Sequence, residues 1–288
     1  MSAIRIFGGA LAVSMMFPVV SASAAEWSDN WAYVNYGPSY KFPGTRFDTV
    51  PGTTDNYRTK DVPVTTLGFT HVSGYKYGSN YLNVELIHSG GNNDPQNGNY
   101  GTQGANEIYG VYRHTLGLSA VTGMKLGGGF IRDYGFDLGF NFGVKNNAIN
   151  AAPFPLVAGP RIKFDVPGFW DVWLHVYKEI YSNNRFNTPT RTNYDAAWSL
   201  GTAWGIDVGP GKFNGFWSNI GPKGKDTSGV DTKTETLIEA FYMFDVGQLT
   251  MNKKGTLYAG LGFQYWKNKY GIKDLNDNFP QLLGVWKF

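Results

Sequence analysis

The stretch FPQLLGVWKF, residues 279–288, decides the fold that the sequence predicts. Read with a period of two, one face of this stretch is apolar and carries the rings of Trp286 and Phe288, whereas the opposite face is mixed and carries Gln281 and Lys287. Such a segment fits a strand with lipid on one side and a wet interior on the other. It fits an edge strand of a soluble sandwich equally well, so the rest of the chain has to distinguish the two.

The composition favours the membrane alternative. Aromatic residues make up 16% of the 288 residues and charged residues also 16%, whereas a soluble domain typically carries about 25% charged residues. Beyond the N-terminal segment there is no run of about 18 apolar residues, which argues against a membrane-spanning helix. The net charge of +3 is too small to indicate nucleic-acid binding, and with no cysteine the fold does not rely on disulfides.

Residues 1–24 have the pattern of a secretory signal peptide. Arg5 precedes an apolar segment that runs to about Val20, and the small residues SASAA (21–25) follow it. We expect cleavage after Ala24, with cleavage after Ala25 as the next choice and an uncleaved signal anchor as the alternative. Residues 25–288 are then a single exported domain, and the expected location is the outer membrane of a Gram-negative cell.

From Glu26 onward, segments of period two alternate with turn-rich connections. This predicts an all-β fold, a transmembrane antiparallel up-and-down β-barrel of about twelve strands. We expect the strands at residues 30–41, 61–74, 80–89, 105–118, 128–145, 155–166, 169–182, 191–208, 212–220, 233–246, 255–267 and 279–288. Segments 61–74 and 212–220 show the poorest alternation.

The connections alternate in character as well. Longer polar connections are expected at 42–60, 90–104, 146–154, 183–190, 221–232 and 268–278, and mostly shorter ones at 75–79, 119–127, 167–168, 209–211 and 247–254. Outer-membrane barrels keep short turns on the periplasmic side and long loops outside, so this order places both termini in the periplasm.

The two faces of the expected strands differ in chemistry. Phe136, Leu138 and Phe140 share one face, whereas Asp133 and Asp137 lie on the other. A charge at the bilayer midplane would cost about 2–4 kcal/mol, so the register of each strand is strongly fixed. The exceptions on the apolar side are Arg132, His114 and Lys178, which are tolerable near an interface where long side chains reach the headgroups.

With the polar faces pointing inward, the lumen contains mixed acids and bases together with aromatic rings. These offer hydrogen bonds and flat surfaces to neutral solutes that have a ring and hydroxyl groups. The candidate solute-binding residues are Tyr33, Tyr81, Glu85, Tyr109, Arg113, Asp137, Arg161, Asp171, Trp173, Tyr177, Asp195 and Glu239. The same alternation places Lys145, Lys163, Glu179, Arg191 and Glu235 in the lumen, and the alternative is that such charges only pair with one another and fill it.

Signals for other chemistry are weak. No cysteine and no His-x-x-x-His spacing is present, so we expect no metal site and no cofactor. A lipid hydrolase would need a serine and a histidine, for which His71, Ser73 and Ser89 are the candidates, but Gly-x-Ser-x-Gly does not occur. We therefore expect no enzyme.

Four stretches of the mature chain carry a family resemblance, and they are THVSGYKYG (70–78), VYRHTL (111–116), FDVPGF (164–169) and QYWKNK (264–269). Through them the chain resembles the Tsx-like nucleoside-specific channel family, and within it proteins described as outer envelope proteins. The resemblance spans most of residues 26–288. It implies a twelve-stranded barrel that passes nucleosides and, in some members, a phage or colicin receptor role at the long loops.

The function expected from the sequence is a monomeric outer-membrane channel for passive diffusion of small solutes, with nucleosides or similar molecules as partners. Its other partner is the lipid of the outer membrane. Two alternatives remain at this stage, namely a barrel lipid hydrolase and a surface receptor or structural barrel with a plugged lumen.

Overall fold

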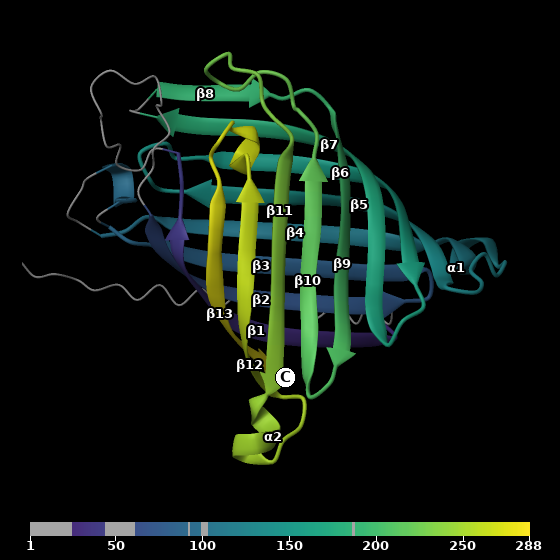
Figure 1. Cartoon of the computed structure of the whole chain (residues 1–288). Helices are drawn as coiled ribbons and strands as arrows, with labels where there is room; N and C mark the ends of the chain where they lie inside the picture. The colour runs from purple at the N-terminus through teal and green to yellow at the C-terminus, as the bar shows by residue number, and fades with distance from the viewer. Residues whose placement is uncertain (1–24, 44–60, 92, 99–102, 186–187) are drawn as a thin grey trace, which may run out of the picture.

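The computed structural model describes residues 25–43, 61–91, 93–98, 103–185 and 188–288. Within these ranges the chain forms one closed antiparallel barrel of twelve strands, one of them interrupted (Figure 1). The strands are β1 (Trp27–Tyr40), β2 (Val62–Tyr75), β3 (Gly78–Ser89), β4 (Asn106–Gly117), β5 (Ile131–Lys145), β6 (Ala152–Phe164), β7 (Gly168–Arg185), β8 (Thr188–Asn193), β9 (Ala197–Val208), β10 (Gly211–Ile220), β11 (Glu235–Asp245), β12 (Leu257–Lys267) and β13 (Asp277–Lys287).

The predicted barrel is confirmed, including the two segments with poor alternation, which form β2 and β10. The ring closes where β1 pairs with β13, with Tyr33 opposite Val285, and β6 pairs with β7. In Figure 1 the strands β9 to β13 cross in front of β2 to β6, as the tilted strands of a barrel do. The expected signal peptide, residues 1–24, lies outside the described residues.

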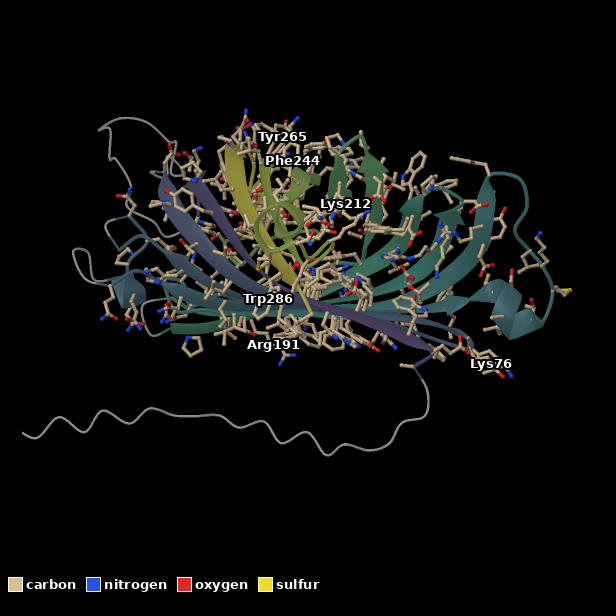
Figure 2. The ribbon with its side chains drawn as sticks, turned by 90° about the horizontal axis from the view of Figure 1, so that it is seen from below. Lys76, Arg191, Lys212, Phe244, Tyr265 and Trp286 are labelled. Atoms are coloured by element: carbon tan, nitrogen blue, oxygen red, sulfur yellow. The ribbon has the colours of Figure 1, made fainter. Side chains whose placement is uncertain are left out.

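The connections divide the barrel into two ends. The long-loop end carries connections 41–61, 90–105, 146–151, 186–187, 221–234 and 268–276, with the short 3₁₀ helices η1 (Gln96–Gly98) and η2 (Lys269–Gly271). The turn end carries connections 76–77, 118–130, 165–167, 209–210 and 246–256. Two of these were not predicted to be helical but contain α1 (Leu118–Thr122) and α2 (Val246–Met251). Figure 2 places Lys76, in the β2–β3 turn, at the same end as α1.

The barrel is apolar outside and polar inside, the reverse of a soluble protein. On β5, Leu138 is 48% exposed and its neighbour Asp137 is 0% exposed; on β13, Trp286 is 59% exposed and Gln281 is 1% exposed. No helix in the described part of the chain has the length and hydropathy needed to span a bilayer. A closed ring of strands with an apolar exterior satisfies its backbone in lipid, so the chain is a membrane-spanning barrel of the outer-membrane kind.

Part of the predicted lumen is wrong because of the interruption at residues 194–196. Strand β9 pairs with β7 in one register and β8 pairs with β7 in a register shifted by one residue, which places Thr192 opposite Tyr181. A shift of one residue moves every side chain to the other face. Arg191, predicted inside and labelled in Figure 2, is therefore on the outside, and Tyr194, in the interruption, is buried against Tyr181.

The predicted polar exceptions on the outer face have polar partners, and Arg132 and His114 also lie near the ends of their strands. Arg132 donates to the backbone carbonyl oxygens of Val166 (3.3 Å) and Gly168 (3.1 Å) at the β6–β7 turn. His114 contacts the side chain of Asn80 (2.8 Å), and Lys178 donates to the backbone oxygen of Tyr194. Each of these polar groups is thus held by polar atoms rather than presented to hydrocarbon.

Replacement of Leu138 by Arg tests the lipid-facing surface. Leu138 lies midway along β5, so the new guanidinium would meet hydrocarbon and lower the free energy of unfolding by about 2–4 kcal/mol. Val121→Arg is the matched control, because Val121 is 49% exposed but lies in α1 beyond the strands. Urea unfolding of both variants in lipid vesicles measures the difference; equal losses would show that the two sites meet the same solvent.

Candidate functional site

Two cross-strand pairs on β3 and β4 form the most accessible polar part of the lumen wall. The register places Tyr81 opposite Arg113 and Glu85 opposite Tyr109. Tyr81 is 38% exposed although it faces inward, so its ring borders the open part of the lumen. Arg113 donates to two backbone carbonyl oxygens at 2.8 and 3.1 Å, and no carboxylate among the described residues forms an ion pair with it. This wall combines an accessible ring, a guanidinium and a carboxylate.

Glu85 is held in place from the neighbouring strands. Tyr33 of β1 donates its hydroxyl to Glu85 at 2.5 Å, and the same hydroxyl lies 3.1 Å from the side-chain oxygen of Asn83. The ring of Tyr33 lies over Gly68 of β2, where a Cβ atom would stand only 2.0 Å from it. Glycine at position 68 therefore lets the phenol lie against the wall and reach the carboxylate.

Asp137 of β5 is the centre of a second, largely buried group. Its carboxylate accepts from the Arg161 side chain at 2.6–2.9 Å, from His175 Nε2 at 2.9 Å and from the Thr115 hydroxyl at 2.7 Å. Arg161 also donates to Asp171 at 3.0 Å. A buried carboxylate with this many donors is held in one position, which makes it part of the scaffold of the wall.

Trp173 connects this group to the lumen. Its ring stacks on His175 with centroids 5.9 Å apart, and the Arg161 guanidinium lies 5.3 Å from its centroid. Behind it, Gly201 of β9 leaves room for the indole, since a Cβ atom there would stand 2.5 Å from the ring. The ring is thus fixed in orientation and partly exposed, as a stacking surface for a flat solute requires.

Tyr177 has a different environment from the one predicted. It is buried, donates to Glu179 at 3.0 Å, and Glu179 pairs with Lys223 at 2.6 Å. Lys223 comes from the connection between β10 and β11 and is itself buried, 4.8 Å from the ring centroid of Tyr194. Tyr177 therefore belongs to a filled part of the long-loop end and is not available to a solute.

Glu239 of β11 lies in a group of neutral polar side chains. Gln281 donates its amide to Glu239 (3.3 Å), to the Tyr40 hydroxyl (3.0 Å) and to Gln264 (3.4 Å). Among the residues that the structure describes, no lysine or arginine forms an ion pair with Glu239. Gln281 is thus a side chain that holds Glu239 in place.

The long-loop end is narrowed by what we name the mouth cluster, consisting of Phe42, Asp94, Lys145, Lys269 and Asp277. Lys269 pairs with Asp277 at 2.7 Å, both fully buried, and Lys145 pairs with Asp94 at 2.6 Å. Both ammonium groups contact the ring of Phe42, at 3.2 Å for Lys145 and 4.1 Å for Lys269. Burial lowers the pKa of Lys269, and the Asp277 carboxylate opposes this shift.

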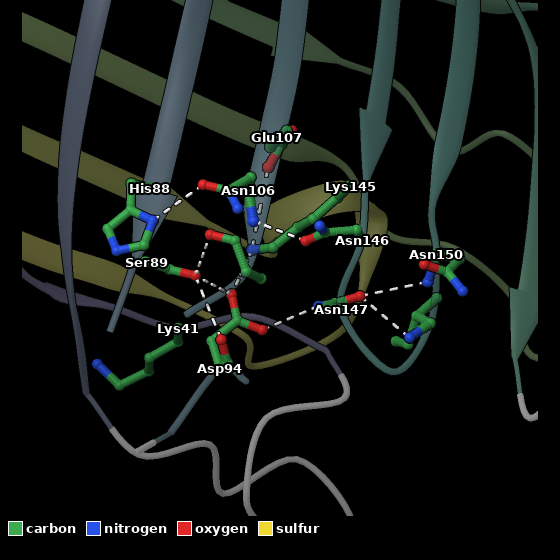
Figure 3. A network of polar contacts seen from close by, with 12 residues as sticks. Lys41, His88, Ser89, Asp94, Asn106, Glu107, Lys145, Asn146, Asn147 and Asn150 are labelled. Atoms are coloured by element: carbon green, nitrogen blue, oxygen red, sulfur yellow. Dashed lines mark hydrogen bonds and ion pairs between the residues drawn. The ribbon is translucent and has the colours of Figure 1, made fainter. Parts of the chain in front are cut away.

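The residues of the mouth cluster come from distant parts of the ring of strands. Lys145 ends β5 and Lys269 lies between β12 and β13, and at least four strands separate these positions either way around the ring. Figure 3 shows one side of the cluster, where Asp94 also accepts from Ser89 (2.7 Å) and Asn147 (3.0 Å). Asp94 is thereby held against the mouth.

The candidate residues from the sequence are thus only partly brought together. Tyr33, Tyr81, Glu85, Tyr109 and Arg113 form one wall, and Asp137, Arg161, Asp171 and Trp173 form the next. Asp195 does not join them, because it lies in the interruption after β8, exposed and beside Gly224. His175 was not predicted to belong to the site, although its even spacing from Trp173 and Tyr177 was a usable signal. Phe42, Lys223 and Lys269 were not predicted either, and the loop sequence holds no signal for them.

The residues named for a hydrolase are not assembled into one. His71 contacts Asn30 (2.8 Å), Ser73 accepts from Asn80 (3.5 Å) and Ser89 donates to Asp94. None of the described hydroxyls among them contacts a histidine. No group of His, Asp and Glu in the described ranges has an arrangement that could hold a metal ion.

Comparison with known proteins finds similar solved structures but no matching family. No family model and no curated protein matches the chain. Similar solved structures include the β domain of the Bordetella autotransporter Brka (11% identity, 91% of this chain and 98% of that chain, TM-score 0.39) and the translocator domain of autotransporter NalP from Neisseria meningitidis (8% identity, 91% and 88%, TM-score 0.43). Pseudomonas aeruginosa OccK5 (OpdH) is 10% identical over 93% of this chain and 99% of that chain, with a TM-score of 0.27.

These values assign neither a family nor a function, and no family model supports the resemblance to Tsx-like channels. The described part of the chain forms a polar lumen with an accessible wall around Tyr81, below a mouth that is narrowed by buried lysines. Such a lumen can bind a small solute by stacking and hydrogen bonding.

Replacement of Lys269 by Met tests the mouth cluster. It leaves Asp277 buried without its partner, and removal of one partner of a buried pair typically costs about 3–5 kcal/mol. Lys273→Met is the control, because its pair with Asp274 is exposed (72% and 79%) and such pairs contribute at most about 1 kcal/mol. Urea unfolding in vesicles measures both; a loss for Lys269→Met no larger than that of the control would show that the pair does not hold the mouth.

Proposed function

We propose that the barrel is an outer-membrane channel through which small polar solutes diffuse passively, with nucleoside-like molecules as the favoured class. One observation carries the proposal, the partly exposed ring of Tyr81 with Arg113 opposite it and Glu85 on the same face of β3. A flat base can stack on the ring, and the charged groups can bond to its polar edge and to sugar hydroxyls. Trp173 offers a second fixed ring on the neighbouring wall.

The proposed transport involves no reaction. Each solute contact in such a wall must be weak enough to allow release, so a few stacking and hydrogen-bonding groups suit a channel better than an enclosed pocket. The charges that are fully paired, such as Asp137 with Arg161, keep the wall in shape and take no part in this binding.

Tyr81→Ala tests the stacking surface. Stacking of a base on an aromatic ring is worth about 1–3 kcal/mol, so the concentration of adenosine that halves the single-channel current should rise roughly tenfold. Tyr77→Ala is the control, since Tyr77 is 42% exposed in the β2–β3 turn, outside the lumen. Block that is the same in wild type and Tyr81→Ala would reject this ring as the binding surface.

The mouth cluster favours a second candidate function, a barrel closed at its long-loop end that serves as a surface receptor or structural protein. Phe42 is 5% exposed and contacted by lysines from distant parts of the ring. Planar-bilayer recordings distinguish the two. A protein that inserts, as shown by its resistance to extraction, but never conducts would favour the closed barrel.

A further inference from the structure

The connection between β4 and β5, which contains α1, is folded onto the turn end of the barrel. The Ser119 hydroxyl donates to Asp133 Oδ1 at 2.6 Å and accepts from the backbone N–H of Leu126 at 3.0 Å. A Cβ atom at Gly127 would stand 2.2 Å from the backbone oxygen of Arg132, so the connection passes directly over the start of β5. It is therefore held in one arrangement, beyond the ends of the strands (Figure 1).

Between this connection and the strand ends lies an open cavity of about 610 Å³, whose lining includes the basic residues Lys125, Arg132 and Lys163 and the acidic residue Asp133. The register places Lys163 opposite Asp133 and Asp171. Within the described part of the chain, however, neither Lys163 nor Lys125 forms an ion pair or a side-chain hydrogen bond. Asp133 accepts only from neutral donors, at 2.6–3.2 Å. The cavity therefore presents more positive than negative charge.

Arg132 reaches this cavity through an irregularity of the sheet. The register of β5 against β6 shifts at this position, so Arg132 is the extra residue of a β-bulge, a feature that redirects a side chain. Its side chain is 43% exposed, and that of its acidic neighbour Asp165, 3.8 Å away, is 68% exposed. An exposed pair of this kind interacts weakly, so the guanidinium stays available to a ligand at the rim between the cavity and the outer face.

Aromatic rings on the outer face mark the depth of the cavity in the membrane. Phe130, Phe164 and Trp170 contact one another beside the adjoining ends of β5, β6 and β7, with ring centroids 4.8–6.0 Å apart. Phe130 and Trp170 are exposed. Outer-membrane barrels carry such girdles where hydrocarbon meets the headgroups. The neighbouring cavity therefore lies at the level of the lipid phosphates.

We infer that this cavity binds the phosphate of an anionic phospholipid from the leaflet on the turn side of the membrane. Lys125 and Lys163 supply two ammonium groups, and Arg132 supplies a guanidinium, whose planar set of donors suits phosphate oxygens. Exposed Met124 and the ring cluster offer apolar contact to the acyl chains. A free phosphate ion would use the same cations but none of this apolar surface. The inference does not depend on the proposed channel function.

Native mass spectrometry of the intact barrel, released from nanodiscs of phosphatidylglycerol and phosphatidylcholine in equal amounts, tests the site. The wild type should retain phosphatidylglycerol in preference. In Lys125→Gln/Lys163→Gln its apparent affinity should fall at least about tenfold, because each basic side chain near an anionic surface strengthens binding. Lys253→Gln/Lys254→Gln is the control, since it removes two exposed lysines from the connection after α2, at the same end of the barrel, and it should leave the affinity unchanged.

The wild-type measurement does not depend on the folding of any variant. Equal retention of the two lipids by the wild type, or equal losses of affinity in the two double variants, would overturn the site. A titration with inorganic phosphate distinguishes the two sources of the phosphate group. Displacement of phosphatidylglycerol by an equal concentration of inorganic phosphate would overturn the assignment to a lipid, whereas retention of the lipid would support it. None of these outcomes bears on conductance, so the channel is tested separately.

Discussion

The structure depends on a pairing register between neighbouring strands that stays consistent all the way around the closed barrel. In hydrocarbon each backbone N–H and C=O must find a partner within the barrel, and β1 pairing with β13 provides this for the two strands that would otherwise be edges. The same pairing fixes which side chains face lipid. Irregularities of register occur between Gly37 and Tyr40, between Ile131 and Asp133, and at 194–196. All three lie near strand ends, because a slip in the middle would turn carboxylates such as Asp137 into lipid.

A polar lumen imposes a second requirement, since a charge away from bulk water needs a partner. Asp137 meets it with Arg161 and His175, and Glu179 meets it with Lys223. These groups are enclosed and their hydrogen bonds are used, so they stabilise the shape of the wall. Tyr81, Arg113 and Glu239 differ. The ring of Tyr81 is partly exposed, and neither Arg113 nor Glu239 has an ion-pair partner among the described residues. Whether a side chain is paired and buried, or exposed and unpaired, therefore distinguishes residues that fill the lumen from residues that can bind a solute more clearly than residue type does.

The twelve strands and their faces could be predicted because each depends on a local pattern. A strand between lipid and water alternates residue by residue, so Leu138 and Asp137 reveal their sides from sequence alone. The one-residue slip between β8 and β9 has no such signature, and it is why Arg191 and Asp195 were placed wrongly. The contacts of Lys269 with Phe42 join residues far apart in the chain, and no spacing could indicate them.

The mouth cluster bears on how a channel of this kind would be shaped. A buried ion pair contributes little net stability compared with an apolar pair of similar size, but it accepts only a narrow range of geometries. The two ion pairs that contact the phenyl ring of Phe42 therefore fix its position more than they stabilise the barrel. With the mouth set in this way, a solute entering from the long-loop end meets paired charges first. The accessible wall formed by Tyr81, Arg113 and Glu85 lies deeper, so discrimination between solutes would take place below the mouth.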